Sequence, residues 1–401
     1  MTEEPCGTVI VGASTAGLAT AEALRELGCT DPITLIGDEP HLPYSRPALT
    51  KQVLSGGWTP AQATLVDAVG LQQRDVRVLV GVRATRLNLQ DQEIGTVRVQ
   101  DARTGRIRFR TLVIATGVTP RRHPAVPTAR TVRTLDDVLA LRAAWSQGPR
   151  VAVIGGGVLG CELASAARGA GLDVEIITRD PGLRPGRLGR LVDERVELLF
   201  ARHGVRSRCC VDVVASRVSG RVTTLELSDG SHVEADLVLA AIGSEPAVDW
   251  LRGSGLEVRD GVLCAPDGQA APGVFAVGDV SARWDARAGR PVRIENQTRA
   301  IEQAHDLAAT LLTGAVPATR PQYFWTELFG TRIQALGCFP PEAPLHVVAG
   351  DIDGDRFVAA CGPPGAVSGV VGWSMAREFR LARALVTEQG STSTTTNGAL
   401  R

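Results

Sequence analysis

Two glycine-rich turns have the residue types and the spacing needed to hold the pyrophosphate of a dinucleotide. The first reads GASTAG, with Ser14 where a middle glycine is usual, and the second reads GGGVLG, with all three glycines in register. Glycine lets the backbone curl tightly and offer N–H groups to phosphate oxygens at the start of a helix. The second turn is therefore the stronger indication. The glycines concerned are Gly12, Gly17, Gly155, Gly157 and Gly160.

The residue after the second strand of each unit indicates which dinucleotide binds. Asp38 lies 21 residues beyond Gly17, where a carboxylate can hold both hydroxyls of an adenosine ribose, although it could also be a solvated turn residue. The matching position after the second turn is Thr178, followed by Arg179. A guanidinium with no acid at that position suits a 2′-phosphate, so the pattern favours NADPH over NADH. The alternative is that Arg179 is only a solvated turn arginine.

Three further apolar runs end in residues that suit ligand binding. LVIATG ends at Gly117, LVLAAIG at Gly243 and GVFAVGD at Asp279. Each run predicts a buried strand, and ligands of open α/β sheets bind beyond the carboxyl ends of the strands. An aspartate there can accept a hydrogen bond from the ribityl chain of a flavin. Taken alone, each residue could equally close a turn.

The chain has a single lysine, Lys51 in YSRPALTKQVL, among 43 basic residues. An arginine-rich coding bias could have left this lysine by chance. The alternative is that its position needs a slender, rotatable point charge, which a planar guanidinium cannot replace.

The elements around these residues repeat in kind. An apolar, β-branched run at 8–12 precedes a helical stretch at 14–28 and a second strand from Ile33, and the same order returns at 151–178. Two such βαβ units predict two dinucleotide-binding domains, each with a parallel sheet. The other predicted elements are strand-rich stretches at 76–114 and 211–243, a helix at 298–312 and further strand-like sequence beyond residue 321.

Composition and charge argue against several classes of function. The 401 residues carry no net charge, so no long-range field favours nucleic acid or an anionic membrane. No apolar run reaches the ~20 residues that span a bilayer, and the first residues show no secretory signal, so we expect a cytoplasmic protein. The eight cysteines form no CxxC and the six histidines no i, i+4 pair, so we expect free thiols and no metal site.

The chain resembles the FAD-dependent, NAD(P)H-linked ferredoxin reductases that serve monooxygenases and dioxygenases, within the glutathione-reductase superfamily. The resemblance runs from about residue 6 to residue 385. It is carried, in order, by VGASTAGLATAEALRELG, GDEPHLPYSRPALTK, LVIATG, VRTLDD, VIGGGVLGCELA, GVFAVGD, VRIENQTRAIEQA and YFWTELFG.

The resemblance implies an α/β fold with two Rossmann-like dinucleotide-binding domains and a C-terminal α+β domain. We expect a discontinuous FAD domain at 1–117 and 244–318, an NAD(P) domain at 118–243, a C-terminal domain at 319–387 and a disordered tail at 388–401. The positions that the resemblance implies for FAD contact are Ala16, Asp38, Arg46, Lys51, Ala84, Arg133, Asp279 and Gln297, with Trp325 beside the isoalloxazine ring.

The resemblance also implies a partner for the single lysine. In similar reductases a glutamate at the position of Glu162 pairs with this lysine near N5 of the flavin. We therefore predict a Lys51–Glu162 ion pair whose cation stabilises the reduced flavin, and we predict Lys51, Glu162 and Trp325 as catalytic residues. Glu162 is expected in the first turn of its helix, where the helix dipole favours a carboxylate.

Thiols that related enzymes use are missing from the sequence. Residues 14–28 hold no cysteine pair, and the loop HLPYSRPALTK has Ser45 but no cysteine. We therefore predict hydride transfer from NAD(P)H to FAD and then single-electron transfer to a 2Fe–2S or similar ferredoxin, which feeds a cytochrome-type monooxygenase or a Rieske oxygenase. Two alternatives stay open: a flavoenzyme that reduces a small molecule such as a quinone directly, and a non-catalytic flavin-binding redox partner.

Two observations bear on the electron acceptor. Ferredoxins are usually acidic, so a docking patch could use surface arginines, although solvated charge is the simpler interpretation of each. The arginines concerned are Arg290, Arg293, Arg332 and Arg377. The chain also has Thr-Glu-Leu at 326–328 where the family commonly has Ser-Asp-Gln, and Ser-Met-Ala-Arg at 374–377 near a usual Asn-Arg-Pro run.

Overall fold

The computed structural model describes residues 6–285, 289–315, 320–340 and 343–387. They divide into two compact units. Unit 1 is formed by the described residues of Met1–Leu49, Trp58–Thr119 and Ser244–Thr319, and unit 2 by those of Thr50–Gly57, Pro120–Gly243 and Arg320–Arg401. The tail predicted at 388–401 lies outside the described residues, and the assignment of domains to FAD and NAD(P) stays a prediction.

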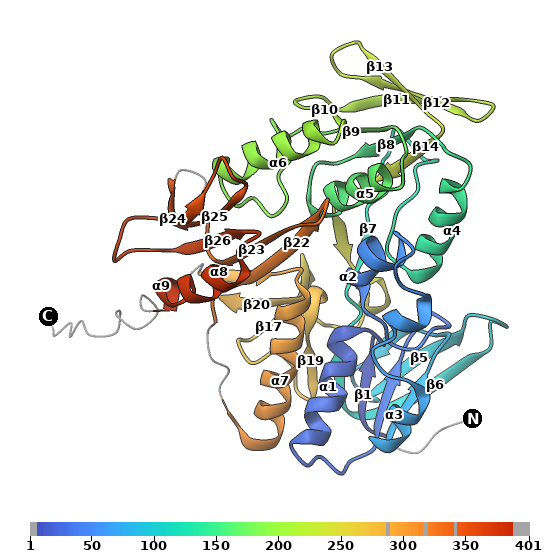
Figure 1. The fold of residues 1–401 in the computed structure, drawn as a ribbon. Helices are drawn as coiled ribbons and strands as arrows, with labels where there is room; N and C mark the ends of the chain where they lie inside the picture. Colours follow the sequence, from blue (N-terminus) through green and yellow to red (C-terminus); the bar gives the residue numbers. More distant parts are fainter. Residues whose placement is uncertain (1–5, 286–288, 316–319, 341–342, 388–401) are drawn as a thin grey trace, which may run out of the picture. The chain divides into compact units, whose positions relative to one another are not determined.

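Unit 1 consists of a mainly parallel sheet, smaller antiparallel and mixed sheets, and several helices (Figure 1). Its elements are β1 (Cys6–Val11), α1 (Thr15–Glu26), β2 (Ile33–Ile36), α2 (Arg46–Ala48), η2 (Pro60–Ala63), α3 (Ala68–Gln73), β3 (Val76–Leu79), β4 (Val82–Asn88), β5 (Glu93–Arg98), β6 (Thr104–Ile114), β7 (Val118–Pro120), β15 (Ser244–Pro246), η3 (Asp249–Leu251), β16 (Val258–Arg259), β17 (Gly261–Cys264), β18 (Gln269–Ala271), β19 (Val274–Ala276), η4 (Gly278–Val280), β20 (Ser281–Asp285), β21 (Arg290–Arg293) and α7 (Gln297–Thr313).

The main sheet of unit 1 has the strand order β18-β19-β6-β1-β2-β3. The strands from β19 to β3 pair in parallel. Because side chains alternate along a strand, Ile10 of β1 packs with the residues of α1 and α7, whereas Val9 and Val11 pack on the opposite face. The sheet is therefore apolar on both faces, and its carboxyl edge is where β1 runs into Gly12 and α1.

Unit 2 contains a four-stranded parallel sheet, a three-stranded sheet and a five-stranded antiparallel sheet. Its elements are η1 (Leu49–Val53, a π-helical turn whose first residue belongs to unit 1), α4 (Leu135–Trp145), β8 (Val151–Ile154), α5 (Val158–Gly169), β9 (Val174–Ile177), α6 (Arg190–Arg202), β10 (Arg206–Arg208), β11 (Val213–Ser219), β12 (Val222–Leu227), β13 (His232–Ala235), β14 (Leu237–Ala240), β22 (Tyr323–Leu328), β23 (Thr331–Gly337), β24 (Leu345–Asp351), β25 (Arg356–Cys361), β26 (Gly369–Trp373), α8 (Ala376–Ala382) and α9 (Ala384–Thr387).

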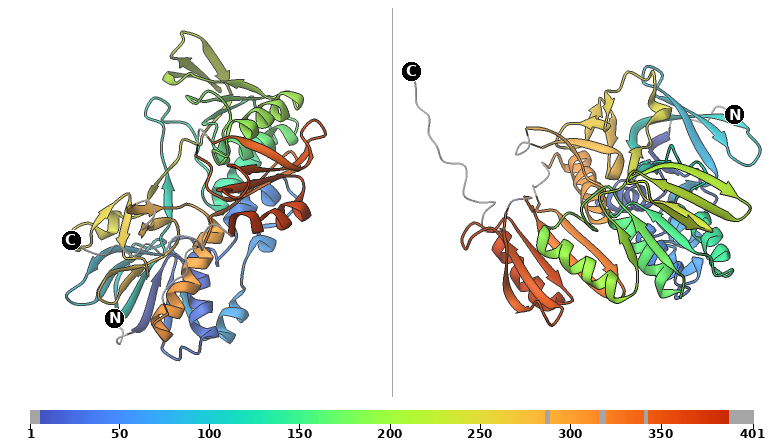
Figure 2. Two further views of the ribbon diagram at one scale, coloured as in Figure 1. Left: turned by 90° about the vertical axis from the view of Figure 1, so that its left-hand side faces the viewer. Right: turned by 90° about the horizontal axis from the view of Figure 1, so that it is seen from above.

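The parallel sheet of unit 2 has the order β10-β9-β8-β14, and the antiparallel sheet has the order β22-β23-β26-β25-β24. Helix α8 lies against β25 and β26 of the antiparallel sheet (Figure 2). Its Phe379 packs so closely on Gly372 that a Cβ there would lie 2.8 Å from the phenylalanine. The strand-like sequence beyond residue 321 is thus a sheet with its own helices, as the α+β prediction required.

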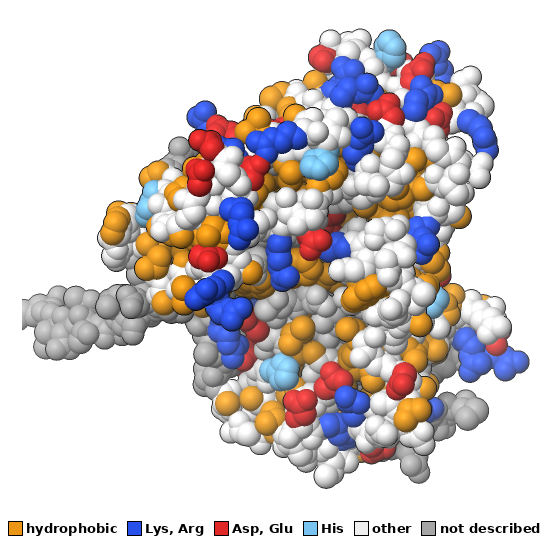
Figure 3. Space-filling model, in the orientation of Figure 1, with side chains coloured by type: hydrophobic (Ala, Val, Ile, Leu, Met, Phe, Trp, Pro, Cys, Tyr) orange, Lys and Arg blue, Asp and Glu red, His pale blue; other side chains and the backbone are white. Residues whose placement is uncertain are grey.

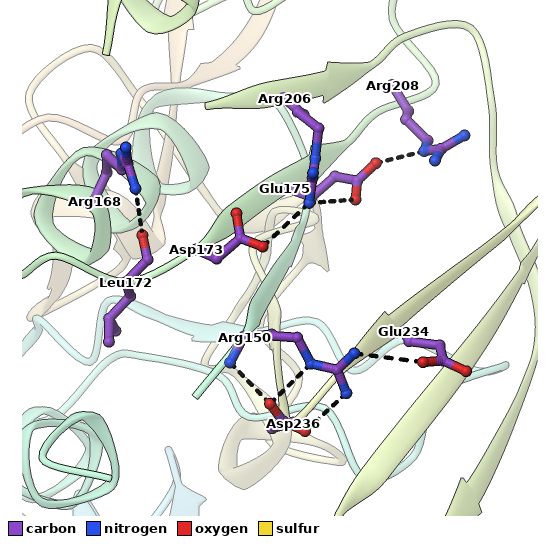
Figure 4. Close-up of polar contacts among 9 residues, drawn as sticks. All are labelled: Arg150, Arg168, Leu172, Asp173, Glu175, Arg206, Arg208, Glu234 and Asp236. Atoms are coloured by element: carbon purple, nitrogen blue, oxygen red, sulfur yellow. Dashed lines mark hydrogen bonds and ion pairs between the residues drawn. The ribbon is translucent and has the colours of Figure 1, made fainter. Parts of the chain in front are cut away.

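Arginine–carboxylate pairs close the amino edge of the parallel sheet in unit 2 (Figure 4). Arg150, directly before β8, donates from Nε and Nη2 to the two oxygens of Asp236, directly before β14, at 3.1 and 3.0 Å. Arg206, the first residue of β10, pairs with Asp173, which lies directly before β9, at 3.3 Å. These pairs tie neighbouring strands together at the edge opposite to the one where Gly155 follows β8.

The predicted elements and charge pattern are present. The α/β class is confirmed, and the helix predicted at 298–312 lies within α7, Gln297–Thr313. On the face shown in Figure 3, basic and acidic side chains are interspersed, in keeping with zero net charge. No helix among the described residues is long and apolar enough to cross a membrane.

Candidate functional site

The turn of unit 1 is a tight cradle in which two glycines are sterically required. Gly12 has φ of +124°, and a Cβ on it would lie 2.1 Å from the carbonyl oxygen of Ala115. A Cβ on Gly17 would lie 2.0 Å from the carbonyl oxygen of Gly12. Ser14 is the N-cap of α1, with extended backbone at φ −133°. Serine is compatible with that conformation, so the middle position does not require glycine for the fold.

The turn of unit 2 repeats this geometry. Gly155 has φ of +114°, and a Cβ on it would lie 2.2 Å from the carbonyl oxygen of Ala241. A Cβ on Gly160 would lie 1.9 Å from the carbonyl oxygen of Gly155. Gly157, the N-cap of α5, has φ of −79°, and a Cβ on it would meet no described atom within 4 Å. The space beside Gly157 is therefore available to a ligand.

Both helix N-termini suit a pyrophosphate. Among the described residues, neither α1 nor α5 has an N-cap side chain bonded to its first turn, and neither has an acid in that turn. The positive end of each helix dipole and the N–H groups of the first turn can therefore serve an anion. The two turns fit dinucleotides by the chemistry of their donors and by the close approach that their glycines permit.

Two predicted FAD residues follow β2 and already carry polar partners. Asp38 forms an ion pair with Arg83 at 3.4 Å, and both side chains are more than half exposed. Arg46 pairs with Glu39 at 2.7 Å, and Glu39 also accepts a hydrogen bond from Tyr44 at 2.5 Å. Asp38 is thus open to solvent beyond the strand, whereas Arg46 is part of a local network.

Several other predicted FAD positions gather near the start of α1. Ala16 lies on α1, and a Cβ on Gly278, next to Asp279 of η4, would approach the Cβ of Ala16 to 2.9 Å. Gln297, the first residue of α7, donates to the hydroxyl of Thr15 at 3.4 Å. Asp279 and Gln297 therefore lie beside the glycine turn of unit 1.

The remaining predicted FAD positions lie elsewhere. Gly117 has φ of +69° and follows β6. Ala84 lies on β4, next to Arg83, the partner of Asp38. Arg133 belongs to unit 2, where its backbone N–H donates to Asp137 in the first turn of α4. Contact of these residues with FAD stays a prediction.

The predicted ion pair between Lys51 and Glu162 is present in unit 2. The Lys51 ammonium lies 2.8 Å from Oε1 of Glu162, and both side chains are nearly buried, at 9% and 8% exposed. The expected place of Glu162 is wrong in one respect. Helix α5 begins at Val158 and has no acid in its first turn, so Glu162 is its fifth residue and the helix dipole does not account for it.

Two threonines complete the surroundings of Glu162, and the sequence reasoning missed both. Thr326 of β22 donates to Oε1 at 2.7 Å, and Thr50 of η1 donates to Oε2 at 2.7 Å. A burial pattern alone could not have identified them, because threonine is common in strands and turns. The only signal was the position of Thr50 beside the single lysine and of Thr326 beside Trp325.

Trp325 contacts two cations. The Lys51 ammonium lies 4.9 Å from the centroid of its ring, and the Arg332 guanidinium lies 5.1 Å from it. Both distances are in the range of cation–π attraction. The three predicted catalytic residues, Lys51, Glu162 and Trp325, therefore form one cluster.

The residues that follow β9 are those expected to contact the adenosine ribose of NAD(P) and to distinguish NADH from NADPH. Thr178 is buried and accepts a hydrogen bond from the backbone N–H of Asp180. Arg179 is 78% exposed, and its guanidinium lies 4.0 Å from the carboxylate of Asp212. The N–H of Val211 donates to the carbonyl of Thr178, and this hydrogen bond brings Asp212 close to Arg179. Burial lowers the pKa of nearby His123, although Asp212 opposes that shift. The sequence analysis missed Asp212, which has no motif.

Gly243 has φ of +98° and follows β14. The free cysteines are Cys29, Cys161, Cys209, Cys210, Cys264, Cys338 and Cys361. Burial raises the pKa of the Cys161 thiol strongly and that of Cys264 to about 12. Such thiols are poor nucleophiles. No group of residues in the described part of the chain could hold a metal ion.

The four arginines considered for docking are not equivalent. Arg293 is only 10% exposed and pairs with Asp260 and Glu295 at 3.0 and 2.6 Å, so its charge is largely neutralised. Arg290 and Arg377 are exposed, and the exposed Arg332 lies over Trp325.

Comparisons with known proteins agree with these features. Residues 7–305 match the family described as pyridine nucleotide-disulphide oxidoreductase. The chain is 34% identical over 386 residues to the benzene 1,2-dioxygenase system ferredoxin–NAD(+) reductase subunit of Pseudomonas putida, covering 95% of this chain and 92% of that protein. It is 33% identical over 391 residues to the biphenyl dioxygenase system ferredoxin–NAD(+) reductase component of Paraburkholderia xenovorans, covering 96% and 94%.

A solved structure agrees over nearly the whole chain. The covalent putidaredoxin reductase–putidaredoxin complex matches with a TM-score of 0.87 and 28% identity, covering 96% of this chain and 94% of that one. The names of both reductases specify NAD(+), so these relatives give no support to the predicted preference for NADPH. This chain is an oxidoreductase of the pyridine nucleotide-disulphide oxidoreductase family and, within that family, belongs to the ferredoxin reductases of oxygenase systems.

Proposed function

We propose that the chain oxidises NADH, passes the electrons through bound FAD and delivers them singly to a small 2Fe–2S or similar ferredoxin that feeds an oxygenase. The observations that carry the proposal are two glycine turns of matching geometry, one in each unit, together with a buried Lys51–Glu162 pair within unit 2. Two dinucleotides in one chain are what a hydride donor and a flavin require. The relatives named as ferredoxin–NAD(+) reductases support the same function.

When bound, FAD supplies the redox chemistry, because a flavin accepts two electrons together and releases them one at a time. The chain's own residues bind and orient. The turn from Gly12 to Gly17 and the start of α1 are assigned to the FAD pyrophosphate, and Asp38 to its ribose. The turn from Gly155 to Gly160 is assigned to the pyrophosphate of NADH.

Lys51 and Glu162 act electrostatically: Lys51 supplies the positive charge, and Glu162 holds it in place. A fixed positive charge stabilises negative charge that develops during reduction, and it does so most strongly where water is excluded. Glu162 holds the ammonium at 2.8 Å, and the Trp325 ring lies on one side of it. A slender ammonium fits between these partners, whereas a forked guanidinium would displace one of them.

The lack of a suitable thiol favours direct transfer of electrons from the flavin to an external acceptor. The loop between Asp38 and Lys51 contains no cysteine, and buried Cys161 has a raised pKa that disfavours its thiolate. A disulfide relay is therefore disfavoured, although the family takes its description from such chemistry. The Thr-Glu-Leu run at 326–328 lies on β22 with Trp325, so it is where acceptor choice could differ from that of relatives.

For the nicotinamide dinucleotide we propose NADH, with Asp212 offsetting Arg179. The carboxylate lies 4.0 Å from the guanidinium and would repel the 2′-phosphate that Arg179 alone would attract. Asp212→Asn is expected to raise kcat/KM for NADPH relative to NADH about fivefold, the effect of one exposed charge. Asp229→Asn, which removes another exposed acid of unit 2, serves as the control.

Steady-state reduction of cytochrome c tests the proposed function. FAD-loaded protein and NADH should reduce cytochrome c rapidly only after a 2Fe–2S ferredoxin is added. Rapid turnover with a quinone and none through any ferredoxin would instead favour the small-molecule reductase. Failure of NADH and NADPH to reduce the bound flavin would favour the non-catalytic alternative.

A further inference from the structure

We propose that Thr50 and Thr326 are positioning residues that fix the carboxylate of Glu162 and, through it, the ammonium of Lys51. This inference rests on the proposed function, since it refines how the chain's single lysine is held for flavin reduction. The residues come from three elements: η1, α5 and β22.

The geometry around Glu162 uses both carboxylate oxygens. Oε1 accepts from the Lys51 ammonium at 2.8 Å and from the Thr326 hydroxyl at 2.7 Å, and Oε2 accepts from the Thr50 hydroxyl at 2.7 Å. An ionised carboxylate only accepts hydrogen bonds, so each threonine hydroxyl must donate its single proton to Glu162. The three donors therefore hold the carboxylate through both of its oxygens.

Burial makes these hydroxyls matter. Thr326 is fully buried and Thr50 is 6% exposed. A buried ion pair is retained well only when additional hydrogen bonds satisfy the remaining lone pairs, because water cannot do so. Hydrogen bonds to a charged group are also stronger than neutral ones. The threonines therefore supply the bonds that water would supply at a surface pair.

The local backbone explains how neighbours in sequence reach one carboxylate. Thr50 and Lys51 are consecutive, yet one contacts Oε2 and the other Oε1. They lie in a π-helical turn, Leu49–Val53. Such widened turns are rare and occur frequently at functional sites.

Trp325 and Thr326 make a second consecutive pair. Trp325 faces the ammonium at 4.9 Å, while Thr326 holds the carboxylate that the ammonium contacts. Strand β22 thus supplies one group to each half of the ion pair.

The single lysine offers a direct probe of this arrangement. Protein produced with lysine labelled at Nζ by ¹⁵N has one labelled side chain, so its ammonium gives one resonance. The spectrum is recorded on FAD-loaded protein without nucleotide, and stopped-flow absorbance then measures flavin reduction by NADH. The variants are Thr326→Val, Thr50→Val and Thr326→Ser. Thr223→Val, a buried strand threonine of unit 2, controls for the loss of a hydroxyl elsewhere.

We expect Thr326→Val and Thr50→Val each to shift or broaden the ammonium resonance and to slow flavin reduction about tenfold, the loss expected for one hydrogen bond to a charge. Thr326→Ser, which keeps the hydroxyl, and Thr223→Val should each retain the wild-type ammonium resonance and the wild-type rate of flavin reduction. If both valine variants kept the wild-type resonance and rate, or lost only thermal stability, the positioning role would be wrong. If wild-type flavin were not reduced by NADH at all, the proposed function would fail, whatever the resonance showed.

Discussion

The glycine turns of the two units have nearly the same backbone and differ at the middle residue. Gly12 and Gly155 have φ of +124° and +114°, and a Cβ on either would collide with a carbonyl oxygen of a neighbouring strand end. The middle residue is Ser14 in unit 1 and Gly157 in unit 2. The outer glycines are thus demanded by packing within the protein, whereas the middle one is set by what must fit outside the backbone.

A second difference lies at the ends of the strands that follow. Unit 1 has Asp38, with its carboxylate more than half exposed, beyond β2. Unit 2 has buried Thr178 beyond β9, and the carboxylate that pairs with Arg179 belongs to Asp212, which is distant in sequence. The same fold therefore presents two different charge patterns to two nucleotides.

The largest effects are expected from substitutions of the outer glycines. Gly12→Ala and Gly155→Ala would each force the backbone to shift, at a cost of about 3 kcal/mol, because a Cβ would lie 2.1 or 2.2 Å from a carbonyl oxygen. We expect Gly12→Ala to yield colourless protein. Gly155→Ala should retain the yellow flavin but fail to be reduced by NADH. Flavin content and anaerobic titration measure the two outcomes.

Matched controls are available for both glycine substitutions. Gly28 and Gly148 also have positive φ, but a Cβ on either would meet nothing within 4 Å. Gly28→Ala and Gly148→Ala should cost only about 1 kcal/mol each and leave both ligands bound. Loss of FAD from Gly155→Ala, with FAD retained by Gly12→Ala, would reverse the assignment of the two turns.

An intermediate effect is expected at Asp38. Asp38→Asn should weaken FAD binding about tenfold, because the ribose loses a charged acceptor, with little change in thermal stability since the Arg83 pair is exposed. Fluorescence titration of the apoprotein with FAD measures the dissociation constant. Asp101→Asn removes another exposed arginine partner in unit 1 and should leave FAD affinity unchanged. Equal affinities for all three proteins would remove Asp38 from the site.

The smallest effects should come from exchanging the middle residues. Gly157→Ser should stabilise unit 2 by about 0.5 kcal/mol, since φ of −79° suits serine and an N-cap hydroxyl is favourable, yet it should raise KM for NADH severalfold by narrowing the approach. Ser14→Gly should lower stability slightly and leave FAD bound. Thermal unfolding and steady-state kinetics separate the two effects. An unchanged KM in Gly157→Ser would mean that the open space beside residue 157 is not used.

Much of the fold could be predicted because its signals are local. The turns at Gly12 and Gly155 follow short apolar strands and precede helices, so spacing alone predicted both βαβ units. The α7 helix was predicted for the same reason, since its apolar residues recur at helical intervals.

The surroundings of Glu162 could not be predicted from local signals. Its partners Thr50 and Thr326 are 112 and 164 residues away in sequence, and only the folded chain brings them together. The place of Glu162 was also wrong: it was expected in the first turn of its helix, but α5 begins at Val158 and Glu162 is its fifth residue. Asp212 was missed because a backbone hydrogen bond between Val211 and Thr178, and not a sequence motif, brings it to Arg179.

Anaerobic stopped-flow mixing of FAD-loaded protein with NADH tests most directly whether the ammonium of Lys51 serves flavin reduction. We predict rapid loss of the yellow absorbance in the wild type and at least about tenfold slower loss in Lys51→Met, with FAD still bound. Arg332→Met, which removes the other cation over Trp325, should reduce at nearly the wild-type rate. Equal rates for wild type and Lys51→Met would contradict this assignment of the chain's single lysine.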